Sequence, residues 1–250
     1  MQQAVYVRDL GNMEYGDAWR VQDALLLENT NKKIKLAKGE AAGETIHHLL
    51  FCEHPPVYTL GKSGKEEHVL ISKEELAKRN IGYYPTNRGG DITFHGPGQV
   101  VGYPIIDLEK FFTDIGRYLR FLEDVIILTL AHYGLKGERS PGETGVWLDP
   151  SNKMMARKIC AMGVRCSRWV TMHGFALNVN TDLSFFDRII PCGIFHKGVT
   201  SIQKVIGTSV DVTDVHRHLI RHFADIFSSD VKQISRDELS LLLSHNEEAV

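Results

Sequence analysis

The glycine-rich stretch at residues 88–103, RGGDITFHGPGQVVGY, constrains this chain more than any other segment. Glycine or proline occupies six of its positions: Gly89, Gly90, Gly96, Pro97, Gly98 and Gly102. The pattern predicts a glycine turn, a strand at 91–94, a glycine-proline turn and a second strand. Because glycine permits positive φ and a close approach to the backbone, two interpretations are open. The stretch is either a tight hairpin, or a binding surface bordered by Arg88 as a cation and His95 as a proton carrier.

Length and composition predict one globular domain spanning residues 1–250. The chain has 250 residues, of which 43% are hydrophobic and 24% charged, with no internal repeat and no clear linker. A formal net charge of −2 gives no basic footprint, so we expect no nucleic-acid partner. No apolar run approaches the roughly 20 residues that span a membrane, so we expect no membrane association.

The cysteines and the N-terminus favour a cytoplasmic location. The four cysteines, Cys52, Cys160, Cys166 and Cys192, are widely spaced, and none forms a C-x-x-C pair. This spacing indicates neither a zinc site nor dithiol chemistry, and a reducing compartment is the simplest setting. The N-terminal MQQAVYVRDLG lacks the basic start and apolar core of a signal peptide.

Hydrophobic periodicity predicts strands and helices in irregular order. We expect helices at 15–29, 73–78, 111–133, 213–227 and 235–244. The segment 30–44 is expected to be an exposed connection, with the alternative that it carries the end of the first helix. We expect strands at 4–10, 45–52, 57–60, 91–94, 100–106, 145–148, 154–165 and 169–178. This order predicts an α+β fold with a mixed, mostly antiparallel sheet flanked by helices.

Cys192 and Lys158 are the strongest candidates for chemistry. Cys192 stands between proline and glycine in IIPCG, which predicts a turn within reach of a substrate. The alternative is a small buried side chain, the usual state of a free cysteine. A nucleophilic role requires a thiolate, and so a nearby cation or base. Strand alternation places Lys158 and Ile159 on opposite faces, but the sequence leaves open whether Lys158 points inward or to solvent.

Other candidates carry weaker signals. His216, His218 and His222 lie in a predicted helix, with His218 and His222 one turn apart. Without a third ligand in register, this spacing favours a solvated face over a zinc site, so we expect no metal. The segment GKSG at 61–64 lacks the full pattern of a phosphate-binding loop, and we expect no cofactor. His54, His95 and His173 are each available to pair with Cys192 as a cysteine–histidine dyad.

The full string at 88–103 resembles the R-G-G-x-x-T-(aromatic)-H-x-x-G-Q-x-x-x-Y pattern of the LipB-type octanoyltransferases. These enzymes belong to the biotin/lipoate protein ligase-like superfamily. The matching positions are Arg88, Gly89, Gly90, Thr93, Phe94, His95, Gly98, Gln99 and Tyr103. Further segments agree in order and spacing: HPPVYTLG at 54–61, KICAMG at 158–163, HGFALN at 173–178 and PCG at 191–193. The resemblance runs from about Glu14 to Ser201.

The resemblance implies a role for each matched residue. Cys192 falls on the nucleophile that carries the acyl group as a thioester, and Lys158 on the general base. The implied substrate-binding residues are Arg88, Gly89, Gly90, Asp91, Ile92, Thr93, Phe94, His95, Ala161, Met162, Gly163, Gly174, Phe175 and Ala176. His54 and His173 are candidates for a supporting role.

The implied reaction needs neither ATP nor a cofactor. An octanoyl group passes from octanoyl-acyl carrier protein to a lysine of a lipoyl domain, as in the E2 subunits of 2-oxoacid dehydrogenases or the glycine cleavage H protein. One alternative is an ATP-dependent lipoate or biotin protein ligase on the same scaffold, which also uses a lysine. The thiol of Cys192 separates the two, because adenylate chemistry needs no thiol nucleophile. A second alternative is a binding module without catalytic activity.

Overall fold

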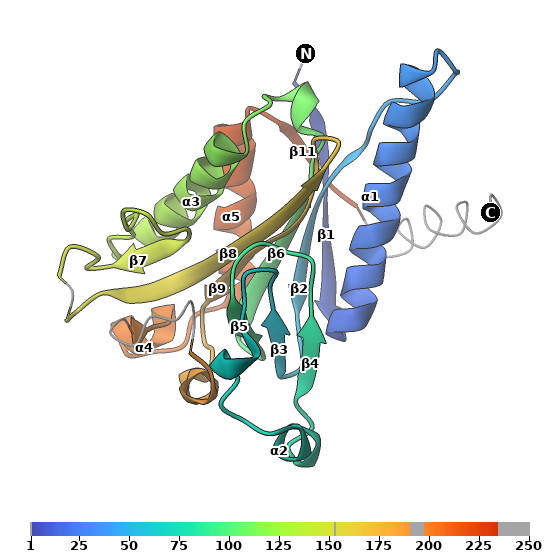
Figure 1. Ribbon diagram of the computed structural model, residues 1–250. Helices are drawn as coiled ribbons and strands as arrows, with labels where there is room; N and C mark the ends of the chain where they lie inside the picture. Colours follow the sequence, from blue (N-terminus) through green and yellow to red (C-terminus); the bar gives the residue numbers. More distant parts are fainter. Residues whose placement is uncertain (1, 153, 191–197, 235–250) are drawn as a thin grey trace.

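Two β-sheets, one large and one small, organise this protein, and helices cover both faces of the large sheet (Figure 1). The computed structural model describes residues 2–152, 154–190 and 198–234. The strands are β1 (Ala4–Asn12), β2 (His47–Glu53), β3 (Val57–Leu60), β4 (Gly82–Pro85), β5 (Ile92–His95), β6 (Gln99–Ile105), β7 (Val146–Leu148), β8 (Arg157–Ser167), β9 (Val170–Asn178), β10 (Gly198–Val199) and β11 (Asp230–Gln233). The helices are α1 (Tyr15–Ala37), α2 (Lys73–Lys78), α3 (Ile115–Ala131), α4 (Ile202–Ile206) and α5 (Val212–Phe227), with 3₁₀ turns η1 (Glu66–His68), η2 (Leu108–Lys110) and η3 (Leu183–Arg188).

The large sheet has the strand order β10-β8-β9-β6-β2-β1-β11, and β7 adds to β8. Its central strands β8, β9, β6 and β2 pair antiparallel, whereas β1 pairs parallel with β2 and β11, and β10 pairs parallel with β8. The sheet is therefore mixed, and the predicted α+β fold in one domain is confirmed.

The central strands bury both faces of the large sheet. On β2, Leu49 and Phe51 pack into the core beneath α3 and α5. The next residues, Leu50 and Cys52, pack into a second core beneath α1. Successive side chains of a strand point to opposite faces, so a strand covered on both sides is mostly apolar. This explains the apolar run LLFC at 49–52 within the buried strand predicted at 45–52, which also buries His47 and His48.

The small sheet has the order β4-β3-β5 and corrects the hairpin interpretation of the stretch 88–103. β5 pairs antiparallel with β3, whereas β6 pairs with β2 and β9 in the large sheet. The Gly96-Pro97-Gly98 turn therefore carries the chain from one sheet into the other. Gly98 adopts a φ of +77°, which L side chains rarely tolerate. The stretch thus spans the junction between the two sheets.

Several predicted boundaries differ from the structure. α1 continues to Ala37 rather than ending at residue 29. The Asn29 side chain within it bonds to both backbone polar groups of Ile46, the residue before β2. The predicted N-cap of α2 is confirmed, since Ser72 Oγ accepts from the backbone N–H of Glu75 over 3.2 Å. The short elements β4, β10, β11 and α4 were not predicted. The predicted helix at 235–244 lies outside the described residues.

None of the helices in the described ranges has the length and apolar character required to cross a membrane.

Candidate functional site

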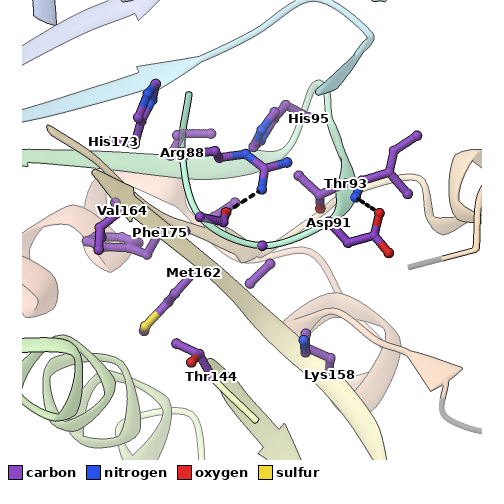
Figure 2. Close-up of a pocket in the computed structure, with 18 of the residues that line it drawn as sticks. Arg88, Asp91, Thr93, His95, Thr144, Lys158, Met162, Val164, His173 and Phe175 are labelled. Atoms are coloured by element: carbon purple, nitrogen blue, oxygen red, sulfur yellow. Dashed lines mark hydrogen bonds between the residues drawn. The ribbon is translucent and has the colours of Figure 1, made fainter. Parts of the chain in front are cut away.

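A cavity of about 550 Å³ at the junction of the two sheets is the candidate site. Figure 2 shows the turn at 88–91 crossing over β8, with side chains from β5, β8 and β9 around it. Fifteen of the predicted site residues line this cavity: Arg88, Gly89, Gly90, Asp91, Ile92, Thr93, His95, Lys158, Ala161, Met162, Gly163, His173, Gly174, Phe175 and Ala176. The fold therefore brings the three segments together, as the resemblance implies. A volume of this size is typical of a pocket for a small molecule.

The turn at 88–90 rests directly on the backbone of β8. The N–H of Gly89 donates to the carbonyl of Val164 over 2.9 Å. A Cβ on Gly163 would lie 2.6 Å from the carbonyl oxygen of Gly89, so any side chain at this position would push the turn away. Gly90 has a φ of +86°. These contacts explain physically why the pattern requires glycine in both segments.

Arg88 fastens the turn to the small sheet. Its Nη2 donates to the carbonyl oxygen of Thr59 over 2.6 Å and to Thr59 Oγ1 over 2.9 Å. Its Nη1 donates to the carbonyl oxygen of Gly89 over 3.0 Å. The residue is only 8% exposed, so a planar group with several fixed donors satisfies buried acceptors here. Arg88 therefore shapes the cavity wall and brings a buried positive charge to it.

His95 is buried and takes part in a chain of hydrogen bonds. Gln99 Nε2 donates to the Phe94 carbonyl and to Asn178 Oδ1, so Gln99 Oε1 accepts from His95 Nδ1 over 2.8 Å. His95 Nε2 then accepts from the hydroxyl of Thr59 over 3.2 Å. Burial lowers the pKa of His95 well below 6.5, and the neighbouring His54 and Arg88 lower it further. The folded protein therefore favours neutral His95, and its expected role as a proton carrier stays a prediction.

His54 lies outside the cavity lining and contacts it through Tyr103. Its Nδ1 donates to the carbonyl of Met13 over 2.7 Å, so its Nε2 accepts from the hydroxyl of Tyr103 over 2.6 Å. Burial lowers the pKa of His54 to about 4. Tyr103 lines the cavity, as does Tyr15, whose ring stacks on His95 with centroids 5.8 Å apart. Burial raises the pKa of Tyr15 to about 12, so its hydroxyl stays protonated.

His173 differs from the other two histidines considered as partners for Cys192. Its Nε2 donates to Asn87 Oδ1 over 2.7 Å, and its backbone N–H donates to Gln22 Oε1 over 2.9 Å. Its Nδ1 has no hydrogen-bond partner in the described part of the chain. Burial lowers the pKa of His173 to about 3, with Arg88 and Arg165 contributing. Of the three, His173 alone keeps a ring nitrogen without a partner among described groups.

Lys158 lies on the β8 edge of the cavity, opposite His173 in Figure 2. It pairs with Trp147 on one side and with Val199 on the other. Its Nζ is 4.6 Å from the centroid of the Trp147 ring, within the range of a cation–π interaction. The side chain is half-buried and reaches the cavity, which resolves the two orientations that the sequence left open.

Cys192, with Pro191 and Gly193, lies outside the described residues. The first described residues after it, Gly198 and Val199, pair with Arg157 and Lys158. The proposed meeting of this thiol with Lys158 therefore stays a prediction.

Phe94 is placed away from the cavity. Its ring stacks on Phe185 with centroids 4.5 Å apart, in the core of the small sheet. Alternation along β5 turns Thr93 and His95 to the cavity and Phe94 to the opposite side. Cavity residues that the sequence analysis did not assign to substrate are Tyr15, Gln99, Val101, Tyr103, Leu119, Gly142, Glu143, Thr144, Val164, Asn178, Phe186 and Val199. Three of them, Gln99, Tyr103 and Asn178, belong to the recognised motifs. Their place in the motifs was the sequence signal that could have identified them as cavity residues.

Comparison with known sequences identifies the family. A model described as the lipoyl protein ligase A/B catalytic domain matches residues 14–224. An octanoyltransferase of Christiangramia forsetii is 55% identical over 93% of this chain and 99% of the relative. An octanoyltransferase of Flavobacterium johnsoniae is 54% identical over 92% of this chain and 100% of the relative. These matches confirm the resemblance seen in the motifs.

Solved structures show the same fold at low identity. A bipartite lipoate protein ligase of Thermoplasma acidophilum has a TM-score of 0.65 and 18% identity, covering 96% of this chain and 90% of the other. A lipoate-protein ligase A bound with ATP has a TM-score of 0.63 and 16% identity, covering 96% and 92%. The architecture is therefore shared with lipoate protein ligases, and the fold alone does not separate a ligase from an octanoyltransferase.

Proposed function

Because this chain belongs to the octanoyltransferases of the lipoyl protein ligase A/B family, and so is an acyltransferase, we propose that it uses a thioester intermediate on Cys192. The donor is octanoyl-acyl carrier protein, and the acceptor is a lysine of a lipoyl domain. The supporting observation is the position of Lys158. Its side chain reaches the cavity formed by the 88–103 stretch and the 173–178 segment.

The first half-reaction moves the acyl group from one sulfur to another. Lys158, as the general base, takes the proton of the Cys192 thiol, and the thiolate attacks the carbonyl carbon of the donor thioester. A new carbon–sulfur bond forms, the bond to the carrier breaks, and the carrier leaves as a thiol with the proton from Lys158. Exchange between thioesters is close to neutral in free energy, so ATP is not required.

The second half-reaction forms an amide. The amine of the acceptor lysine attacks the acyl-Cys192 carbonyl, and Lys158 takes the proton that this nitrogen loses. The carbon–sulfur bond then breaks, and Cys192 regains a proton. The amide is more stable than the thioester, so this step drives the overall transfer. Backbone N–H groups near Gly163 and Gly174 are candidates to stabilise the oxyanion in both steps.

The cavity has an apolar lining suited to a saturated acyl chain. Val101, Met162 and Phe175 come from three neighbouring strands of the large sheet, and Leu119 joins them from α3. The turn at 88–91 and Lys158 are among the polar groups of the lining. We therefore place the carbonyl of the acyl group near Lys158 and its methyl end among these apolar side chains.

The E2 subunits of 2-oxoacid dehydrogenases and the glycine cleavage H protein are the proposed acceptors, and the cytoplasm the proposed location. One structural neighbour is the lipoate protein ligase of an archaeal lipoylation system that includes an E2 lipoyl domain, which supports this acceptor class. The widely spaced cysteines fit a reducing compartment.

An ATP-free assay tests the proposal. The protein is mixed with octanoyl-acyl carrier protein and an unmodified lipoyl domain, and the transfer is followed by intact mass. We expect one octanoyl adduct on the enzyme and one on the acceptor. A requirement for ATP would favour the ligase alternative, and an enzyme adduct that survives Cys192→Ala would contradict the nucleophile assignment. Absence of transfer both without and with ATP would favour a binding module without catalytic activity.

Matched variants assign the two roles. Cys192→Ala should abolish the adduct, whereas Cys166→Ala, a cysteine outside the cavity lining, should keep it. Lys158→Ala should lower turnover by about a hundredfold or more, as loss of a general base does. Lys136→Ala is the control, because the Lys136 side chain is 84% exposed and outside the lining. Turnover by Lys158→Ala close to that of this control would remove Lys158 from the mechanism.

A further inference from the structure

Three imidazoles meet on the surface between α3 and α5, away from the cavity. They belong to His132, His218 and His222, and one nitrogen from each lies within 4.8 Å of the others. Nε2 of His132 is 2.9 Å from Nε2 of His222, and the His132 ring stacks on His218 with centroids 3.7 Å apart. Within the described ranges, this is the one group of three or more histidine, cysteine or acidic side chains arranged so closely.

The sequence pattern favoured a solvated face because it offered no third ligand beside His218 and His222. The fold brings His132 to them from another helix. His218 and His222 share one face of α5, because residues four apart lie one above the other on a helix. His132 caps the C-terminal end of α3, 86 positions before His218 (218 − 132 = 86). α3 packs against α5 in the main core, and Figure 1 shows the two helices side by side on one face of the large sheet. The reason for preferring a solvated face over a zinc site, the lack of a third ligand, therefore no longer applies.

We propose that His132, His218 and His222 form a binding site for a divalent cation of the Zn²⁺ class. Neutral imidazole is a preferred ligand of Zn²⁺, Cu²⁺ and Ni²⁺, and three imidazoles leave one coordination position for water. Two nitrogens that each lie about 2.05 Å from one tetrahedral ion are about 3.3 Å apart. The Nε2 atoms of His132 and His222 are 2.9 Å apart, at hydrogen-bond distance, so an increase of only about 0.4 Å would give that spacing.

A carboxylate lies beside the three imidazoles. Oδ2 of Asp214 is 3.6 Å from Nε2 of His218 and accepts a hydrogen bond from the hydroxyl of Tyr133 over 2.9 Å. Carboxylates next to ligating histidines orient the ring and increase its affinity for metal. Tyr133 follows the end of α3, so Asp214 joins the same two segments that the cation would join. A bound cation would thus link the end of α3 to α5.

The proposed cation site is separate from the site of octanoyl transfer, since none of its three histidines lines the cavity. Its expected effect is therefore on stability. A cation bound by the folded chain alone raises the midpoint of thermal unfolding, by roughly 5–10 °C at a free concentration about a hundred times the dissociation constant.

Calorimetric titration with ZnCl₂ tests the site in the untagged full chain. The Cys192→Ala background is used, because a reactive thiolate also binds zinc. We expect one equivalent of Zn²⁺, and His132→Gln, His218→Gln or His222→Gln should each weaken binding at least about tenfold. His216→Gln is the matched control on α5, because the His216 ring instead stacks on Phe51 at 4.5 Å. It should keep wild-type affinity.

A second measurement does not depend on the stability of the variants. Co²⁺ bound by three imidazoles and water should give the visible absorption of a tetrahedral ion, without the charge-transfer bands of a thiolate. Failure to take up one equivalent of either ion would overturn the proposal. Equal affinity in all three cluster variants and the His216→Gln control would also overturn it, as would an octahedral Co²⁺ spectrum.

Discussion

Gly89 donates its backbone N–H to the carbonyl of Val164 over 2.9 Å, and this bond seats the turn at 88–90 on β8. The stretch at 88–103 and the segment at 158–163, which are separate motifs in the sequence, therefore meet at one contact. The position of the turn depends on the absence of a side chain at Gly163, where a Cβ would lie 2.6 Å from the Gly89 carbonyl oxygen. The glycine at 163 is consequently a requirement of packing.

Gly163→Ala should displace the turn and lower octanoyl transfer by about tenfold or more, since misplacing binding groups by an ångström reduces catalysis strongly. The added methyl group should also lower the free energy of unfolding by about 1–3 kcal/mol, as overpacking does. Steady-state kinetics and urea unfolding measure the two effects. Gly43→Ala is the control, because a Cβ on Gly43 meets nothing within 4 Å. Wild-type kinetics for Gly163→Ala would show that the turn tolerates displacement.

Arg88→Lys keeps the charge but removes the planar fork of donors. Arg88 bonds to two acceptors of Thr59 and to the Gly89 carbonyl, which a single ammonium cannot reproduce with the same geometry. We expect the free energy of unfolding to fall by about 1–3 kcal/mol. Amide hydrogen exchange should become faster at Lys62, whose N–H donates to the Arg88 carbonyl over 2.9 Å.

The control for this variant is Arg20→Lys on α1, where the arginine side chain is 78% exposed. Its exchange rates and unfolding should match the wild type, because exposed ion pairs contribute little. If Arg88→Lys protects the Lys62 amide as well as this control does, the charge of Arg88 would be sufficient and its hydrogen bonds dispensable.

The sequence predicted elements whose signals are local. α2 and β3 match their predicted bounds, and β9 begins within one residue of its predicted start, because caps, turns and alternation are read from adjacent residues. The pairing of β5 could not be predicted in this way. The chain reverses at Gly96–Gly98 in a manner that suits a hairpin, and only long-range pairing with β3 assigns β5 to a different sheet.

The candidate site shows the same division. Recognised motifs named most of the cavity wall, whereas Leu119 and Thr144 come from a helix and a loop without any motif. The motif also included Phe94, although alternation along β5 directs that ring into the small core. His132 could not be predicted as a partner of His218 and His222, since its contacts with α5 depend on how two helices pack. The role of Cys192 stays a prediction from the motif.

The buried histidines predict acid sensitivity. Burial is the main cause that lowers the pKa to about 4 for His47 and His54, to about 3 for His48 and His173, and well below 6.5 for His95. The unfolded chain binds protons on these rings below pH 6.5, whereas the folded chain does not until much lower pH. The free energy of unfolding is therefore highest above pH 6.5 and falls as the pH drops towards 4.

Urea unfolding between pH 7.5 and 5 measures this effect. At pH 5.5 the slope should correspond to an uptake of about four protons on unfolding, at about 1.4 kcal/mol per proton and pH unit. His48→Gln should reduce this uptake by about one proton. A free energy of unfolding that is constant over this range would mean that the buried rings are protonated in the folded state.

The last prediction concerns chain-length preference and rests on the proposed octanoyl transfer. Met162 on β8 pairs with Phe175 on β9, and both side chains are among those drawn around the cavity in Figure 2. If the acyl chain lies among these apolar groups, Met162→Trp removes space that a long chain needs and a short chain does not. We expect kcat/KM for octanoyl thioesters to fall by about tenfold or more relative to butanoyl thioesters, the scale of discrimination by an apolar pocket.

Met155→Trp is the matched control, because Met155 is 50% exposed and precedes β8 outside the cavity lining. Both variants introduce the same side chain, so a general effect of tryptophan on folding or solubility would appear in both. A change in the octanoyl-to-butanoyl ratio in Met162→Trp alone would place the chain against β8. If the ratio is unchanged while total activity falls, Met162 borders the carbonyl region instead, and the methyl end of the chain lies elsewhere in the cavity.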